Sequence, residues 1–170
     1  MNIRTIPAGA ICLLVLLLPT GFTQQPVKSS TQIDGSKNPE LIPLDEAFKS
    51  MFLMLCDGPV PRPMSVSGRE YYMRGSGLTE KQQDSVSIAA VKYRLAVNDA
   101  VASAKAALKG PASELAARRQ AATDELNFQF EDIRKSLESD LGPDAYQELV
   151  HFVETEVKSR MTMGRAGREK

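Results

Sequence analysis

The 170-residue sequence has no tryptophan, an aromatic content of 6% and no net charge. So few aromatic residues argue against a thick mixed core and favour thin packing of helix on helix. Strand signals are nearly missing, because no long alternation of Val, Ile, Thr and Tyr is bracketed by turn residues. Lysine plus arginine balance aspartate plus glutamate at 21 each, so no global field draws the chain to nucleic acid.

Cysteine and histidine are scarce as well, and this excludes several kinds of active site. Beyond the N-terminal segment the sequence holds one cysteine, Cys56, and one histidine, His151, whereas zinc sites need clustered Cys and His. Neither a Ser-His-Asp set nor a G-x-S-x-G motif is present. We therefore expect a protein that is not an enzyme, with no catalytic residue, no metal ligand and no cofactor.

The sulfur-containing residues keep one alternative open. Cys56 lies in the apolar run MFLMLCDG, where a cysteine behaves as a small buried hydrophobe. A single thiol cannot form an intramolecular disulfide, so the fold is not disulfide-stapled. Thioethers such as Met161 and Met163 are soft ligands suited to Cu(I), which leaves a metal-responsive module as an alternative.

The N-terminal residues form a targeting segment. Arg4 supplies a positive start, and residues 8–19, AGAICLLVLLLP, form an apolar run of signal-peptide length that is short for a membrane span. We expect residues 1–23 to be a signal peptide and the body of the protein to lie outside the cytoplasm. No A-x-A precedes Thr23, so an uncleaved N-terminal anchor is the competing interpretation.

The rest of the chain predicts an all-α fold of about four helices. Residues 24–42 are polar without periodicity and indicate a flexible linker, residues 43–157 form the helical domain, and residues 158–170 form a basic, disordered tail. Pro43 can start the first helix. Its apolar stripe has helical spacing and consists of Phe48, Met51, Phe52 and Leu55.

We expect residues 57–77 to form the longest loop, because this stretch, DGPVPRPMSVSGREYYMRGSG, contains three prolines and four glycines. Tyr71 and Tyr72 are its large apolar residues. They either pin the loop to the helices or form an exposed contact site for a partner protein.

The stretch GLTEKQQ begins the longest predicted helix. Thr79 is a good N-cap, and Gln82 completes a capping box in which each side chain bonds the other residue's backbone N–H. The helix is expected to run to about Leu108, where Gly110 and Pro111 stop it. Its seam has the alternating four and three spacing of a coiled coil and consists of Val86, Ala90, Tyr93, Val97, Ala100, Ala104 and Ala107.

A third helix follows after a turn of a few residues, so the two should form a long antiparallel αα-hairpin. The third helix begins near Pro111 and Ser113, and the fourth restarts at Gly142 and Pro143. The stripe of the third helix consists of Leu115, Ala122, Leu126, Phe130, Ile133, Leu137 and Leu141.

Charge is segregated along these helices. Residues 124–148 hold eight acids against Arg134 and Lys135, whereas residues 105–119 hold four bases against Glu114. This segregation of charge either attracts a charged client protein, or it keeps the helix surfaces soluble and forms ion pairs within one helix.

One motif resembles a known family. Leu78, Thr79 and Gln82 match the LTxxQ motif of small periplasmic helical proteins, the Spy/CpxP-like chaperones and stress adaptors, and residues 141–147, LGPDAYQ, resemble a degraded second copy. The resemblance implies a cradle-shaped, often dimeric helical body that holds unfolded or partner proteins without a cofactor. It carries over Leu78, Thr79 and Gln82 as structural motif positions. Residues 38–52 also resemble the opening segment of uncharacterised secreted bacterial proteins, which implies no function.

The sequence therefore predicts a periplasmic or secreted bacterial protein that binds other proteins without catalysis, as an ATP-independent chaperone or stress adaptor. The candidate contacts are Tyr71 and Tyr72, and the partners are unfolded clients, a membrane partner or a second copy. A membrane-tethered structural or assembly protein is the first alternative, and it would contact the membrane through an uncleaved N-terminal segment.

Overall fold

The computed structural model describes residues 32–57 and 61–164, so the predicted signal peptide lies outside the described residues. Within these ranges the all-α prediction is confirmed, with short strands as the other regular elements. None of the helices described is long and apolar enough to cross a membrane. The α-helices are α1 (Leu44–Met54), α2 (Val66–Tyr72), α3 (Glu80–Ala107), α4 (Leu115–Leu141) and α5 (Pro143–Phe152).

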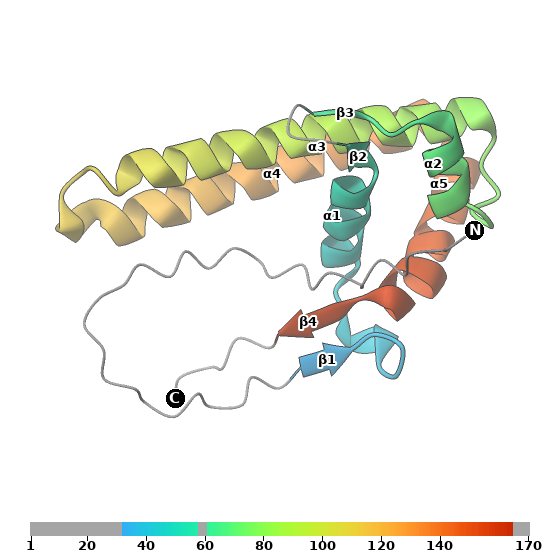
Figure 1. Ribbon diagram of the computed structural model, residues 1–170, viewed down its shortest axis with the longest axis horizontal. Coiled ribbons are helices and arrows are strands. Elements are labelled where there is room, and N and C mark those ends of the chain that lie inside the picture. Colours follow the sequence, from blue (N-terminus) through green and yellow to red (C-terminus); the bar gives the residue numbers. More distant parts are fainter. Residues whose placement is uncertain (1–31, 58–60, 165–170) are drawn as a thin grey trace, which may run out of the picture.

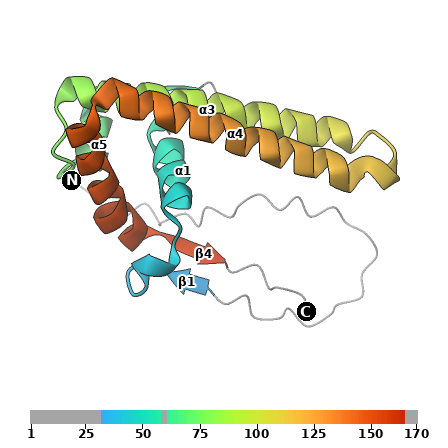
Figure 2. The same cartoon turned by 180° about the vertical axis from the view of Figure 1, so that it is seen from behind.

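The long hairpin of α3 and α4 organises the molecule, as predicted (Figure 1). Its two helices lie side by side over their whole length, and they extend well past α1 in both views (Figure 2). Lys49 of α1 reaches the hairpin with a hydrogen bond of 3.1 Å from its Nζ to Asn127 Oδ1 of α4. We call residues 95–128, the distal part of the hairpin, the arm, and the remainder its base.

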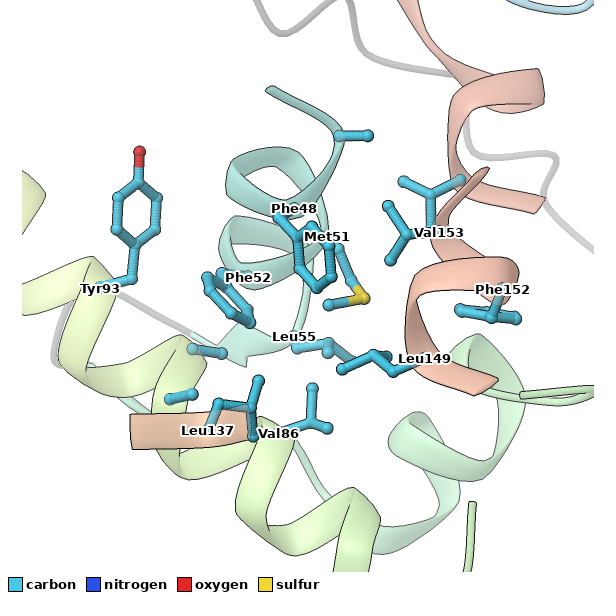
Figure 3. Close-up of a cluster of buried hydrophobic side chains, with 14 of the residues drawn as sticks. Phe48, Met51, Phe52, Leu55, Val86, Tyr93, Leu137, Leu149, Phe152 and Val153 are labelled. Carbon is cyan, nitrogen blue, oxygen red and sulfur yellow. The ribbon is translucent and has the colours of Figure 1, made fainter. Parts of the chain in front are cut away.

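The core lies at the base, where α1 is inserted against the hairpin and the C-terminal elements. Phe48 and Phe52 are completely buried, and the Phe52 ring lies 5.9 Å from Tyr93 and 6.3 Å from Phe130, centroid to centroid. Figure 3 shows Phe48, Met51 and Phe52 of α1 and the adjacent Leu55 in one cluster with Leu149 and Val153. Each buried phenylalanine contributes about 1.5–3 kcal/mol, which stabilises a helix that is too short to form alone.

The predicted capping box at the start of α3 is confirmed. Thr79 N–H donates to Gln82 Oε1 at 2.8 Å, and Gln82 N–H donates to Thr79 Oγ1 at 3.4 Å. Leu78, directly before the cap, is buried in the core. The cap and this contact together fix where α3 begins.

The seams of both hairpin helices change character along their length. At the base, large side chains are buried, among them Val86, Tyr93, Phe130 and Leu137. In the arm, the seam consists mainly of alanine, and most of its residues are only half-buried. The arm is therefore held together by less apolar burial for each residue than the base.

The predicted loop at 57–77 contains structure that the sequence did not reveal. A short ribbon pairs β2 (Cys56–Asp57) with β3 (Arg62–Pro63), and α2 follows. Ser65 caps α2 by accepting a hydrogen bond from Gly68 N–H at 3.3 Å. The loop prediction was wrong at α2 because it relied on the glycine and proline content of the whole stretch. A helix as short as α2 is stabilised by tertiary contacts, which that content does not reveal.

Part of the predicted linker and tail is structured as well. β1 (Gln32–Asp34) pairs antiparallel with β4 (Thr162–Gly164), and single helical turns occupy Pro39–Leu41 and Lys158–Arg160. Ile33 and Met163 pack against the core, which explains why these short strands form. The pairing ties the two ends of the described chain together.

The C-terminal helix begins as predicted, with Gly142 at a positive φ of 76° and Pro143 at its first position. A positive φ favours glycine, so this residue allows the sharp change of direction between α4 and α5. The helix then continues into a π-helical turn at Val153–Val157. Val153 and Val157 are buried, so this turn contributes two side chains to the core.

Candidate functional site

Tyr71 and Tyr72 lie on α2, and they do not pin this segment to the core. The side chain of Tyr71 is 71% exposed and that of Tyr72 is 39% exposed. Their rings contact each other edge to face, with 5.6 Å between centroids. The two tyrosines therefore form an exposed aromatic cluster, which is the surface that a partner contact requires.

The opposite face of α2 explains why Tyr71 is exposed. Arg69 is buried and its Nη2 contacts Asp84 Oδ1 of α3 at 2.5 Å, while Met73 is 1% exposed in the core. Residues two positions apart on a helix point in nearly opposite directions. Arg69 and Met73 anchor one face of α2 to the rest of the protein. Tyr71, which lies between them in the sequence, therefore points to solvent from the opposite face.

An open hollow of about 770 Å³ adjoins Tyr71, between the end of α2 and the C-terminal elements. Figure 1 shows α2 and α5 next to each other at the end of the hairpin away from its tip. We call this feature the tyrosine hollow. Its lining consists of Tyr71, Arg74, Gly75, His151, Phe152, Thr155, Glu156 and Arg160.

The π-helical turn forms one wall of the tyrosine hollow. Thr155 and Glu156 lie on this turn, and Thr155 Oγ1 donates to the His151 carbonyl at 2.9 Å. Arg160 Nη2 donates to Glu156 Oε2 at 2.6 Å. Single π-helical turns occur often at functional sites, and this one contributes Thr155 and Glu156 to the lining that also includes Tyr71.

The chemistry of the hollow suits recognition. Arg74, Arg160 and His151 line the hollow together with the aromatic side chain of Tyr71, and Glu156 is the carboxylate of the lining. Tyrosine and arginine are enriched at protein interfaces, where they stack and donate several hydrogen bonds. The His151 side chain is exposed, and the backbone carbonyl of this residue accepts the hydrogen bond from Thr155 Oγ1.

The LTxxQ positions lie apart from this hollow. Thr79 and Gln82 bond to each other at the start of α3, and Leu78 is buried. The structure brings none of these three residues into the lining of the hollow. Their role in the described structure is to begin the helix.

The sulfur-containing residues are also separated from the hollow. Cys56 is buried and free, and Met161 and Met163 are half-buried beside the core. Across residues 32–57 and 61–164, no group of three or more His, Cys, Asp or Glu residues is placed to hold a metal ion.

A second feature, which was not predicted from the sequence, is a groove on the arm. It measures about 600 Å³ and lies between α3 and α4, with alanines of both helices as its floor and Asp99, Arg118 and Glu125 among its lining residues. Leu95 and Phe128, at the base end of the arm, are 49% and 70% exposed. The signal that could have revealed the groove is the all-alanine end of the α3 seam.

Comparison with protein-family models, with curated proteins and with solved structures finds no match to this chain. The tyrosine hollow and the arm groove are therefore interpreted from their geometry.

Proposed function

We propose that this protein binds other proteins without catalysing a reaction, and that the tyrosine hollow is its contact surface. The observation that carries the proposal is the exposure of Tyr71 beside the arginines of the hollow. A large aromatic side chain costs free energy when it is left in water, and partner binding recovers part of that free energy.

The construction of α2 supports the proposal. The Arg69–Asp84 ion pair and the buried Met73 fix the helix on α3. An anchored aromatic residue loses little conformational entropy when a partner binds, and preorganisation of this kind raises affinity. The surface resembles an interaction site more than a flexible loop that happens to expose tyrosines.

The cellular location of the protein and the type of its partner are proposed from the sequence. We propose that residues 1–23 direct the chain out of the cytoplasm, and that the LTxxQ resemblance points to unfolded or stress-related protein clients. The alternative of a membrane-tethered assembly protein requires residues 1–23 to be retained. N-terminal sequencing of the mature protein distinguishes the two, because an intact terminus supports the tether.

The proposal is tested by suppression of the aggregation of unfolded client proteins at a near-equimolar ratio without ATP. We expect the protein to suppress aggregation and Tyr71→Ser to weaken this effect. Because Tyr71 is 71% exposed and is not part of the core cluster, the variant should retain the helical circular dichroism signal and the melting temperature.

Ile88→Ser is the matched control, since Ile88 is a similarly exposed apolar residue, 53% exposed, outside the hollow. It should leave suppression unchanged. Failure of the protein to suppress any of several clients would overturn the chaperone proposal. Equal losses from Tyr71→Ser and Ile88→Ser would remove the hollow as the contact surface.

A further inference from the structure

Phe128 of α4 is a large aromatic side chain that the rest of the described molecule leaves in water. It is 70% exposed, although side chains of this kind are usually buried. On a helix, the surface neighbours of a residue are those three and four positions away. At Phe128 these neighbours are all acids, namely Asp124, Glu125, Glu131 and Asp132. We call these five residues the Phe128 face.

Most of the negative charge on the Phe128 face has no counter-charge in the described molecule. Glu131 forms an ion pair with Arg134 at 3.0 Å. The other three carboxylates form no ion pair within residues 32–57 and 61–164. Asp124 and Glu125 accept hydrogen bonds of 2.8 and 2.7 Å from glutamine side chains, which are neutral. Lys135 lies on the same side of α4, but it is two helical turns from Phe128, about 10 Å along the axis.

A second phenylalanine on α4 shows what such a surface accepts. Phe130 is 1% exposed, and Lys49 of α1 places its Nζ 5.1 Å from the centroid of the Phe130 ring. The same ammonium group bonds to the Glu46 carboxylate at 2.9 Å. Arg134 lies 5.9 Å from this ring and bonds to Glu131. Helix α4 therefore already contacts α1 through cations on a phenylalanine ring, with carboxylates that pair with those cations.

We propose that the Phe128 face is a docking surface for a basic segment of a partner protein, which places a lysine or arginine side chain on the Phe128 ring. The face of an aromatic ring attracts a cation, and the surrounding carboxylates pair with the same cation or with neighbouring basic side chains. An acidic segment would be repelled by these carboxylates. The charge of the face therefore selects a basic partner.

Helix α1 leaves this surface accessible. Asn127 receives the hydrogen bond from Lys49 of α1, and the next residue on a helix is turned about 100° around the axis. The exposure of Phe128 shows that α1 does not cover its side chain. The Phe128 face shares no residue with the tyrosine hollow. It is therefore a second contact surface, and it does not depend on client binding at Tyr71.

The proposal is tested with the purified protein and a fluorescent, alanine-based helical peptide of about 15–20 residues, with lysine at every third or fourth position. Fluorescence anisotropy gives the dissociation constant. We expect the lysine peptide to bind at low salt and more weakly at high salt, because salt screens exposed charges. The same peptide with glutamate in place of lysine should not bind. Failure of both the lysine peptide and an arginine version to bind would overturn the proposal.

Phe128→Leu tests the aromatic ring, since it keeps an exposed apolar side chain and removes the π face. It should weaken binding of the lysine peptide by about twofold to fivefold, whereas Phe128→Tyr should bind like the original chain. A Phe128→Leu variant with unchanged affinity would overturn the proposal. These side chains are exposed, and circular dichroism checks that the variants fold.

Asp132→Asn tests the charge of the face and should also weaken binding. Asp140→Asn is the matched control, because it removes the same charge from an exposed position of the same helix, about 18 Å from Phe128 along the axis. Equal losses from the two variants would reduce the effect to the overall charge of the helix and would overturn the proposal.

A second copy of this chain is the other occupant that the experiment distinguishes. Sedimentation equilibrium of the original chain and of Phe128→Leu measures self-association directly. We expect Phe128→Leu to leave the association state unchanged. Self-association that Phe128→Leu abolishes would assign the face to a second copy and would overturn the proposal of a basic partner.

Discussion

Tyr93 shows how one of the few aromatic residues is used. Its ring packs between Phe52 and Phe130 at 5.9 and 5.6 Å, and only 4% of the residue is exposed. Burial disfavours the charged phenolate, and the nearby Glu46 carboxylate disfavours it further, so the pKa of Tyr93 rises from 10.0 to about 12. The residue stabilises the fold as a neutral phenol.

This shift predicts a loss of stability in alkali. Between pH 10 and about 12 the unfolded chain releases the Tyr93 proton while the folded chain keeps it, so the free energy of unfolding falls as pH rises through this window. The slope from one such group is at most about 1.4 kcal/mol per pH unit, and the contribution is fully present below pH 10. Urea unfolding from pH 8 to 11.5 measures it.

Tyr93→Phe is the control, because it keeps the ring and removes the titrating hydroxyl. The difference in unfolding free energy between the two proteins should be constant below pH 9 and should change steadily above pH 10. A difference that stays constant up to pH 11.5 would show that Tyr93 has no raised pKa.

At the scale of elements, α3 and α4 each join a well-packed half to a thin half. Tyr93 of α3 and Phe130, Ile133 and Leu137 of α4 are buried at the base. In the arm, alanine brings the helices close but removes little apolar surface from water. The arm should therefore open locally at a lower free energy than the base.

Two leucines of α4 test this contrast. Leu137 is 1% exposed inside the core, whereas Leu126 is half-buried at the start of the arm, where it packs against the edge of the core. Leu137→Ala should lower the free energy of unfolding by about 2–5 kcal/mol, because it leaves a cavity that the base cannot fill. Leu126→Ala should cost about half as much or less, since less of its surface is buried. Chemical denaturation of both variants gives the comparison, and equal costs would contradict the division into base and arm.

At the scale of the whole molecule, the two ends of the described chain are joined at one place. Gly35 follows β1, and its N–H donates to the Met161 carbonyl at 2.9 Å. A Cβ atom at Gly35 would meet the Lys158 carbonyl oxygen at 1.9 Å. No side chain fits there unless the two segments move apart.

Gly35→Ala should therefore separate β1 from β4. Overpacking of this kind costs about 1–3 kcal/mol, and the amides of Gln32–Asp34 should lose protection from hydrogen exchange. Gly164→Ala is the control, because a Cβ atom there has open space within 4 Å, and it should change neither quantity. Unchanged protection in Gly35→Ala would mean that the ribbon does not depend on this close approach.

Much of the fold could be predicted from the sequence, because its signals are local. The capping box at Thr79, the stripe around Phe52 and the restart at Pro143 each depend on residues within one or two helical turns. The exposure of Tyr71 stayed undecided between two interpretations. It depends on the Arg69–Asp84 contact, which joins elements whose packing no local pattern specifies.

The sequence by itself determined that long helices form, where they begin and end, and which faces are apolar, since spacing and capping are properties of a short stretch of chain. Tertiary structure alone decided where α1 packs along the hairpin. That position buries the apolar stripe of α1 at the base, and it leaves the arm groove and Phe128 uncovered. It also decided the tyrosine hollow, which combines α2 with residues from the other end of the chain.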